Sequence, residues 1–545
     1  MQFSTLAKPL TLALLLAIIA FYLYGLGHLP LVGPDEARYA QVAREMFERG
    51  DLITPTLGGH LWFEKPALLY WLMIGSYAVF GVSEWSARLG PAVCGLFSIF
   101  ALFWLGNRVS RTVKHVGLCS ALMLASSLGF IVFSRAASFD VVVTMTLTWA
   151  LAFFIASEIA DNDKQRRRLL AGFYIFVGLS LLAKGLIGLV IPLGILGAYF
   201  VMRRKWPAKS VWASLFWGLP LSALVAATWY GPVLARHGSH FVDEFIVQHH
   251  FARYLSNTYH HPAPVYFYLV ILVLLSLPWT PFAIDALLRV RKWLWRSDDA
   301  LTRMRTFALA WIVVPLIFFS FSNSKLPGYI LPVLPALAFM GGERLATWVD
   351  DETRARWTMR ATGLLCLALA VSALVYSART GEIPTRVTLM ITAPCIIAGT
   401  LTMSPMIGRV IQMLSIAIAV AALALGALHV AAPGYAAQDT AKFLLQEADK
   451  RGYDRTVIYG LQRDDRTPEF YAAGRVTYTD DGEPVMYVGL EQIDNEIKRR
   501  GGPVLVFVPD VDAQLFASQP NFRTVVIASN GRHSLIAVGP LGEWR

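Results

Sequence analysis

Residues 138–168 read SFDVVVTMTLTWALAFFIASEIADNDKQRRR, and this stretch decides the class of fold. The apolar run 138–160 is long enough to cross a bilayer, which takes about 20 mainly apolar residues. A basic cluster, Arg166 to Arg168, follows it closely. Cytoplasmic loops of membrane proteins carry an excess of Lys and Arg. The stretch therefore predicts a transmembrane helix whose basic end faces the cytoplasm.

The composition of the whole chain agrees with this interpretation. Of its 545 residues, 56% are hydrophobic and 16% are charged, and the mean hydropathy is +0.51. Soluble proteins have a lower apolar fraction and about a quarter of charged residues. The net charge of +11 arises from short basic runs between apolar segments, which indicates membrane orientation and argues against a nucleic-acid partner. The four cysteines lie in apolar segments without paired spacing, so we interpret them as small core residues.

Similar apolar runs recur along the chain and predict a mainly α, polytopic membrane protein with about thirteen spans. A further stretch, 66–82, is short, opens with a proline and carries interfacial aromatic residues, so we expect a helix that lies at the membrane surface. The predicted spans are 9–27, 86–107, 115–134, 138–160, 170–184, 186–202, 211–232, 264–286, 306–322, 328–348, 358–377, 386–404 and 409–432.

The basic loops give the orientation of these spans. Each consecutive pair of such loops is separated by two spans, so all of them are expected in the cytoplasm. Counting from them places residues 28–85 and everything after 433 in the periplasm, outside the inner membrane. The basic loops are 161–168, 203–205, 287–305 and 351–356.

The last part of the chain has a different composition, which predicts two domains. Residues 1–432 form the transmembrane domain, and 433–545 form a small periplasmic α/β domain with helices near 439–450 and 490–500. Its expected strands are 456–459, 485–488, 504–508, 524–528 and 534–538.

Several polar clusters from distant parts of the chain are predicted on the outer membrane face. Asp35 and Arg38 share one face of an amphipathic helix, where they could hold a sugar and a phosphate; a solvated surface pair is the alternative. Lys65 is suited to bind a phosphate as a point charge, unless it only extends to the interface from an aromatic belt. Asp140 is a second candidate acid or an N-terminal cap, and Tyr329 lies in an outer turn.

The outer loop 233–263 contains a dense group of histidines, including His249. Together with Glu64, this histidine could bind Zn2+, which accepts mixed oxygen and nitrogen ligands. A polar surface loop is the alternative, and no cofactor is firmly implied. Ionisable groups at the membrane face, rather than at the bilayer centre, argue against a transporter.

Four motifs in this sequence resemble those of the C-type glycosyltransferases in the protein-mannosyltransferase superfamily, and most closely its bacterial aminoarabinose transferases. The motifs are Asp35 to Tyr39, Glu64-Lys65-Pro66 with Tyr70-Trp71, Ser83 to Leu89, and Lys325 to Pro332.

The resemblance implies transfer of 4-amino-4-deoxy-L-arabinose from undecaprenyl phosphate to lipid A phosphates, with resistance to polymyxin as the consequence. It implies that Asp35 and Asp140 are the active-site acids, and that the other site residues bind substrate or metal. A different sugar, a protein acceptor or a lipid flippase remain alternatives. The expected carrier and sugar contacts are Arg38, Lys65, Arg253 and Tyr329, and the candidate metal ligands are Glu64 and His249.

Overall fold

A computed structural model describes residues 3–541 except 111–112, 246–262, 294–296, 462–465, 473, 481, 518 and 520. The chain forms two compact units. The first comprises Met1–Tyr24, Glu64–Leu69 and Leu89–Ala427, and the second comprises Gly25–Phe63, Tyr70–Arg88 and Leu428–Arg545. The proposed domain boundary at 432/433 stays a prediction, because these units are defined by packing alone.

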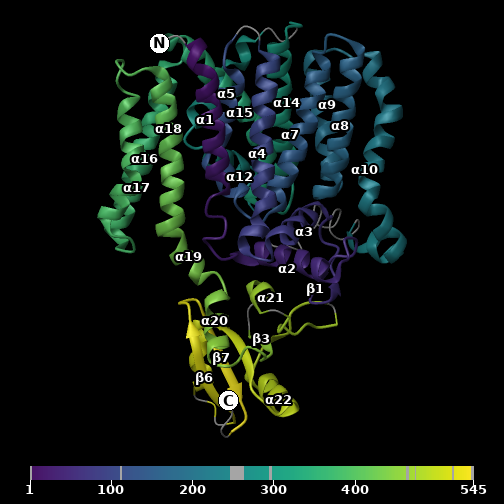
Figure 1. The fold of residues 1–545 in the computed structure, drawn as a ribbon, viewed down its shortest axis with the longest axis vertical. Helices are drawn as coiled ribbons and strands as arrows, with labels where there is room; N and C mark the ends of the chain where they lie inside the picture. Colours follow the sequence, from purple (N-terminus) through teal and green to yellow (C-terminus); the bar gives the residue numbers. More distant parts are fainter. Residues whose placement is uncertain are drawn as a thin grey trace. The chain divides into compact units, whose positions relative to one another are not determined.

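The first unit is a bundle of apolar helices that lie side by side (Figure 1). Each predicted span contains helical structure. The helices are α1 (Phe3–Leu23), α4 (Glu84–Val109), α5 (Val116–Ala125), α6 (Leu128–Ser134), α7 (Phe139–Glu158), α8 (Asp163–Lys184), α9 (Ile187–Arg203), α10 (Lys209–Phe241), α12 (Phe267–Leu275), α13 (Thr280–Leu288), α14 (Ala300–Ser320), α15 (Leu334–Asp350), α16 (Arg356–Thr380), α17 (Thr385–Leu401) and α18 (Arg409–Gly426).

In the described part of the chain, six helices are long and apolar enough to cross a membrane, and the bent pair α5 and α6 makes a seventh if it counts as one span. The protein is therefore a multi-pass membrane protein. Several other predicted spans form shorter or broken helices, as in the stretch that contains α12 and α13. Each of the roughly thirteen predicted spans thus contains at least one helix. Several of these helices are too short to cross a bilayer by themselves.

The stretch 66–82 forms one helix, α3 (Leu68–Phe80), of 13 residues. At about 1.5 Å per residue it is shorter than the roughly 30 Å hydrocarbon core of a bilayer. Its length agrees with a helix that does not cross the membrane.

The second unit contains α2 (Gly33–Arg49), a short hairpin of β1 (Thr56–Leu57) and β2 (His60–Leu61), and a five-stranded sheet. The sheet has the order β4-β3-β5-β7-β6. Strand β3 is parallel to β4 and β5, whereas β7 is antiparallel to both its neighbours. The strands are β3 (Ile458–Leu461), β4 (Met486–Tyr487), β5 (Val504–Pro509), β6 (Arg523–Ser529) and β7 (His533–Gly539).

Alternating residues of the strands build two hydrophobic cores, one on each face of this sheet. Leu505 and Phe507 pack with α20 (Lys442–Lys450) on one face. Val504, Val506 and Val508 pack with α22 (Leu490–Arg500) on the other. The predicted strands and the two main helices of this part of the chain are therefore confirmed.

Candidate functional site

Asp140 lies in the first turn of α7, in the membrane bundle. The side chain of Ser138 caps this helix by accepting a hydrogen bond from the Asp140 backbone N–H, at 3.1 Å. The alternative interpretation of Asp140 as the helix cap is therefore wrong. Because Ser138 satisfies the helix end, the Asp140 carboxylate is available for a partner elsewhere.

That partner is Lys184, at the end of α8. Its Nζ donates to Oδ1 of Asp140 over 2.5 Å, and the two side chains are only 11% and 19% exposed. The same ammonium lies 4.6 Å from the centroid of the Tyr329 ring, a cation-π contact. Two predicted site residues, Asp140 and Tyr329, are thus brought together around a lysine that was not predicted.

The pairing follows from the α7–α8 hairpin, in which the start of one helix lies beside the end of the next. Deeper in the bundle, Ser180 donates to Thr146 across the same two helices at 2.8 Å. A sequence signal for Lys184 existed, since a lysine at the outer end of a predicted span is a functional candidate by default.

Gly328, next to Tyr329, leaves room for the carboxylate. A Cβ atom at this position would collide with the Asp140 carboxyl group. The glycine therefore lets the turn before α15 approach the acid closely.

Glu64 and Lys65 form an ion pair in the bundle unit, with Nζ 2.6 Å from Oε1 and side chains 8% and 14% exposed. A buried ion pair of this kind is costly to desolvate, so each side chain depends on the other as its partner. Lys65 is therefore positioned by the neighbouring acid.

The predicted zinc site finds no support. In the described ranges, no group of three or more His, Cys, Asp or Glu residues could hold a metal ion, and Glu64 is paired with Lys65. His249 and Arg253 lie outside the described residues.

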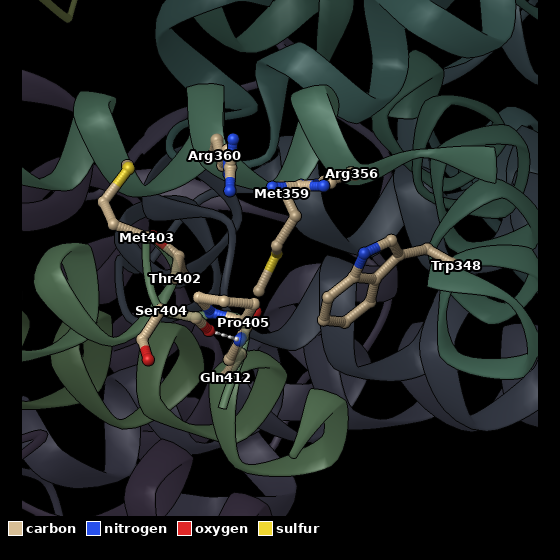
Figure 2. Close-up of a pocket in the computed structure, with 9 residues that line it drawn as sticks. All are labelled: Trp348, Arg356, Met359, Arg360, Thr402, Met403, Ser404, Pro405 and Gln412. Carbon is tan, nitrogen blue, oxygen red and sulfur yellow. Dashed lines mark hydrogen bonds between the residues drawn. The ribbon is translucent and has the colours of Figure 1, made fainter. Parts of the chain in front are cut away.

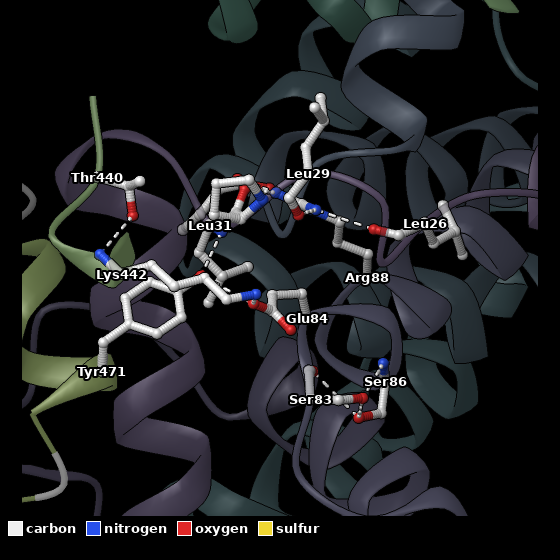
Figure 3. Close-up of polar contacts among 12 residues, drawn as sticks. Leu26, Leu29, Leu31, Ser83, Glu84, Ser86, Arg88, Thr440, Lys442 and Tyr471 are labelled. Carbon is white, nitrogen blue, oxygen red and sulfur yellow. Dashed lines mark hydrogen bonds and ion pairs between the residues drawn. The ribbon is translucent and has the colours of Figure 1, made fainter. Parts of the chain in front are cut away.

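In the second unit, the start of α2 is held by a buried ion pair between Glu36 and Arg88. The guanidinium donates to both carboxylate oxygens, at 3.0 and 2.7 Å. It also donates to the carbonyl groups of Leu26, Leu29 and Pro30. Figure 3 shows Arg88 beside Leu26 and Leu29. The motif Ser83 to Leu89 therefore fixes the chain that leads into α2.

A second contact set in the same unit fixes Glu84. Lys442 donates to its Oε1 over 2.5 Å, and the Tyr471 hydroxyl donates to the same oxygen over 3.1 Å. The backbone N–H of Leu31 donates to that hydroxyl at 2.6 Å. These residues lie close together in Figure 3. The start of α4 and the segment Lys442 to Tyr471, which are distant in sequence, thus form one polar network with Leu31, just before α2 begins.

Asp35 and Arg38 form the predicted i,i+3 pair on α2, at 2.5 Å. The Arg38 guanidinium lies 5.3 Å from the centroid of the Trp62 ring. Trp62 also lies 5.9 Å from the guanidinium of Arg466. The Asp35 side chain is 56% exposed and that of Arg38 is 16% exposed, so the acid faces solvent while the cation is held on an aromatic surface.

Arg466 contacts Glu469, an acid that the sequence motifs did not indicate as a site residue. Arg466 donates to Glu469 over 3.1 Å and pairs with Glu483. Burial raises the pKa of Glu469 to about 7, against the opposing effects of Arg466 and Arg38. Glu469 lies in the first turn of α21 (Thr467–Tyr471), which packs against α2. This short helix gave no periodic signal in the sequence.

Each unit therefore contains a cluster of cations and acids with aromatic side chains. The cations suit phosphate oxygens, because ammonium and guanidinium groups form charge-assisted hydrogen bonds to them. The carboxylates suit hydroxyl and ammonium groups of a sugar. Such clusters favour binding of a phosphate-linked sugar and do not by themselves identify it.

Comparison with known proteins finds one matching family model and several similar sequences. Residues 8–241 match the family described as dolichyl-phosphate-mannose-protein mannosyltransferase. The chain is 30% identical over 372 residues to the undecaprenyl phosphate-alpha-4-amino-4-deoxy-L-arabinose arabinosyl transferase of Aeromonas salmonicida, covering 66% of each chain. It is 31% identical over 365 residues to the protein of the same name from Pseudomonas paraeruginosa, covering 66% of this chain and 64% of that relative. The matched part thus spans just under two thirds of these relatives' length.

Among solved structures, the crystal structure of ArnT from Cupriavidus metallidurans bound to undecaprenyl phosphate matches with a TM-score of 0.74 and 24% identity, and it covers 97% of both chains. The apo state of the same protein gives a TM-score of 0.75 at 23% identity and 98% coverage of both. The chain therefore shares the fold of that protein. The resemblance found in the sequence motifs is confirmed.

Proposed function

We propose that this C-type glycosyltransferase, a relative of the aminoarabinose transferases, moves 4-amino-4-deoxy-L-arabinose from undecaprenyl phosphate to phosphate groups of lipid A. The transfer takes place at the periplasmic face of the bacterial inner membrane. The observation that carries the proposal is the sequence similarity to transferases named for this carrier and sugar. Polar clusters suited to a phosphate-linked sugar support it.

The chemistry of this reaction needs little from a general base. The bond between the anomeric carbon and the carrier phosphate breaks, and its electron pair leaves with undecaprenyl phosphate. A lipid A phosphate oxygen forms the new bond to the same carbon. The acceptor is already anionic near pH 7, so no proton has to be removed from it. Stabilisation of the leaving phosphate by fixed cations is then the main contribution of the enzyme.

The proposed roles follow from the contacts within each unit. In the bundle, Asp140 accepts hydrogen bonds or an ammonium group from the sugar, Lys184 holds the carboxylate in place, and Tyr329 contacts the sugar. Lys65 binds the carrier phosphate and is positioned by Glu64. The pairs Asp140–Lys184 and Glu64–Lys65 support these assignments, because each joins a predicted site residue to a buried partner.

In the second unit, Asp35 is the other proposed acid. Arg38, held against Trp62, contacts the carrier phosphate. Arg253 is proposed as a further substrate contact on the resemblance alone. The network of Arg88, Glu84 and Tyr471 has a positioning role, since it holds the segment from which Asp35 projects.

Complementation tests this function in cells. The chain is expressed in a bacterium that makes undecaprenyl-linked aminoarabinose but lacks its own transferase, and lipid A is extracted for mass spectrometry. We expect lipid A that carries aminoarabinose and growth at higher polymyxin concentrations, with both effects lost in Lys65→Ala. Unmodified lipid A from cells that contain the folded protein in the membrane would contradict the proposal, as would a different added sugar or a glycosylated protein.

A further inference from the structure

A small hollow lies within the bundle unit, where four helices end or begin: α15, α16, α17 and α18. The space between its side chains, open solvent included, is about 200 Å3, so the hollow opens to the surface of the protein. Figure 2 shows the side chains around it. They are Trp348, Arg356, Met359, Arg360, Thr402, Met403, Ser404, Pro405 and Gln412. None of these residues belongs to the clusters proposed for sugar transfer.

One lining residue has an unused hydrogen-bond donor. Trp348 is only 1% exposed, and its indole Nε1 has no hydrogen-bond partner in the described part of the structure. In Figure 2 this nitrogen lies on the edge of the ring that is turned toward Arg356. An indole N–H can only donate, and a buried donor without a partner costs about 1–3 kcal/mol. The indole N–H of Trp348 is therefore suited to donate a hydrogen bond to a ligand in the hollow.

The charge around the hollow identifies the kind of acceptor. Arg356 and Arg360 stand one turn apart at the start of α16, and no described carboxylate lies within ion-pair distance of either guanidinium. The nearby Asp351 pairs with Arg354 instead. No side chain caps the N-terminus of α16 or of α18, so both helices direct partial positive charge and free N–H groups to this end of the bundle. An anion fits these donors.

The surroundings of the hollow favour a lipid as the carrier of this anion. Trp357 and Met406, beside it, are 76% and 92% exposed, and the Arg360 guanidinium lies 5.1 Å from the Trp357 ring centroid. Exposed aromatic residues with basic neighbours are typical of the headgroup level of a membrane. The adjoining loop 351–356 is one of the basic loops that predict the cytoplasmic side.

We propose that the hollow is a binding site for the phosphate of an anionic phospholipid in the cytoplasmic leaflet. Arg356 and Arg360 bind the phosphate oxygens, and Trp348 donates its indole hydrogen bond to the same headgroup. Met403, which is partly exposed, offers an apolar contact to the start of the acyl chains. The site is independent of the proposed sugar transfer. Basic pockets between membrane helices on the cytoplasmic side are a known mode of anionic lipid recognition.

The test measures the thermal unfolding of the full-length protein in detergent during separate titrations with phosphatidylglycerol, phosphatidylcholine and inorganic phosphate. Phosphatidylglycerol is expected to stabilise the wild type more than phosphatidylcholine. The double variant Arg356→Gln/Arg360→Gln should weaken the apparent affinity for phosphatidylglycerol about tenfold or more, because it removes charge-assisted hydrogen bonds. Trp348→Phe, which retains the ring, should cause a smaller loss. Arg386→Gln, an exposed arginine at the other end of α17, is the matched control and should bind like the wild type.

Three results would overturn the proposal. The first is equal stabilisation of the wild type by the two lipids. The second is unchanged affinity for phosphatidylglycerol in the double variant, or the same loss in Arg386→Gln. The third is stabilisation by inorganic phosphate alone at concentrations equal to those of the lipid, which would assign the hollow to a free anion.

Discussion

The carboxylate of Asp140 illustrates how a single residue gains function from its partner. Lys184 neutralises it and leaves it little freedom to move, since the two groups are 2.5 Å apart and largely buried. A carboxylate that is oriented before the substrate arrives does not have to be ordered during the reaction. The proposed role of Asp140 therefore depends on both members of the pair.

Asp140→Asn is expected to reduce sugar transfer by roughly 10²-fold or more, because the sugar loses the charged acceptor that orients it, and misplacement by about 1 Å can cost that much. The change also leaves Lys184 without its anionic partner, at a cost of about 3–5 kcal/mol in stability. The double variant Asp140→Asn/Lys184→Met should regain stability without regaining transfer. Rates with lipid-linked donor and unfolding temperatures distinguish the two effects.

Asp163→Asn is the control for this prediction. Asp163 also pairs with a basic residue in α8, but it is 86% exposed, so its loss should cost at most about 1 kcal/mol and leave transfer unchanged. Transfer that persists in Asp140→Asn would return this acid to a purely structural role.

The raised pKa of Glu469 predicts that the free energy of unfolding depends on pH. Burial raises the pKa of Glu469 from 4.5 to about 7. Between these two pH values the folded state therefore keeps a proton that the unfolded state has lost. The resulting stability is fully present below about pH 4.5 and is lost as the pH rises through 7. Glu469→Gln should remove this dependence, and unfolding temperatures between pH 4.5 and 7.5 measure it. An equally steep loss of stability in the variant would assign the dependence to another group.

At the scale of elements, the turn before α15 is shaped by its contact with α7. Gly328 allows this contact because it has no side chain. Gly328→Ala is expected to displace the Asp140 carboxylate and to reduce transfer, with a smaller effect on stability. Gly197→Ala, in α9, is a suitable control because nothing lies within 4 Å of the added methyl group. Wild-type transfer rates in Gly328→Ala would show that the position of the carboxylate is not critical.

The helix α2 depends on the ion pair of Glu36 and Arg88. Arg88→Met leaves a buried carboxylate and several carbonyl groups without their donor, so we expect a loss of about 3–5 kcal/mol. Arg44→Met breaks the more exposed pair with Glu48 and should cost at most about 1 kcal/mol. Unfolding temperatures of both purified variants provide the measurement, and equal losses would contradict the proposed role of Arg88.

The elements themselves could be predicted where one short-range pattern governs them. The short apolar run Val504 to Val508 predicted β5, and both faces of this strand are buried in a hydrophobic core. The contact of Lys184 with Asp140 could not be predicted, because it depends on how α7 and α8 pack. Helix α21 was missed for a similar reason: with only five residues, it is stabilised by tertiary contacts rather than by its own periodicity.

At the scale of the whole molecule, the orientation in the membrane remains a prediction from the basic loops. A phosphatase reporter fused after Arg545 should be active, because that enzyme folds only after export, and a fusion at Lys205 should be inactive. Activities in intact cells, corrected for the amount of fusion protein, provide the measurement. An inactive fusion at Arg545 would reverse the predicted topology and place the sheet-containing tail in the cytoplasm.

The most direct test of the proposed function is transfer by the purified full-length protein in detergent. The protein is incubated with undecaprenyl phosphate-aminoarabinose and lipid A, and the lipids are then analysed by mass spectrometry beside a sample with Asp140→Asn. We predict lipid A that is heavier by one aminoarabinose for each modified phosphate, an equivalent amount of free undecaprenyl phosphate, and neither product with the variant. Intact donor together with unmodified lipid A after incubation with folded wild-type protein would contradict the account.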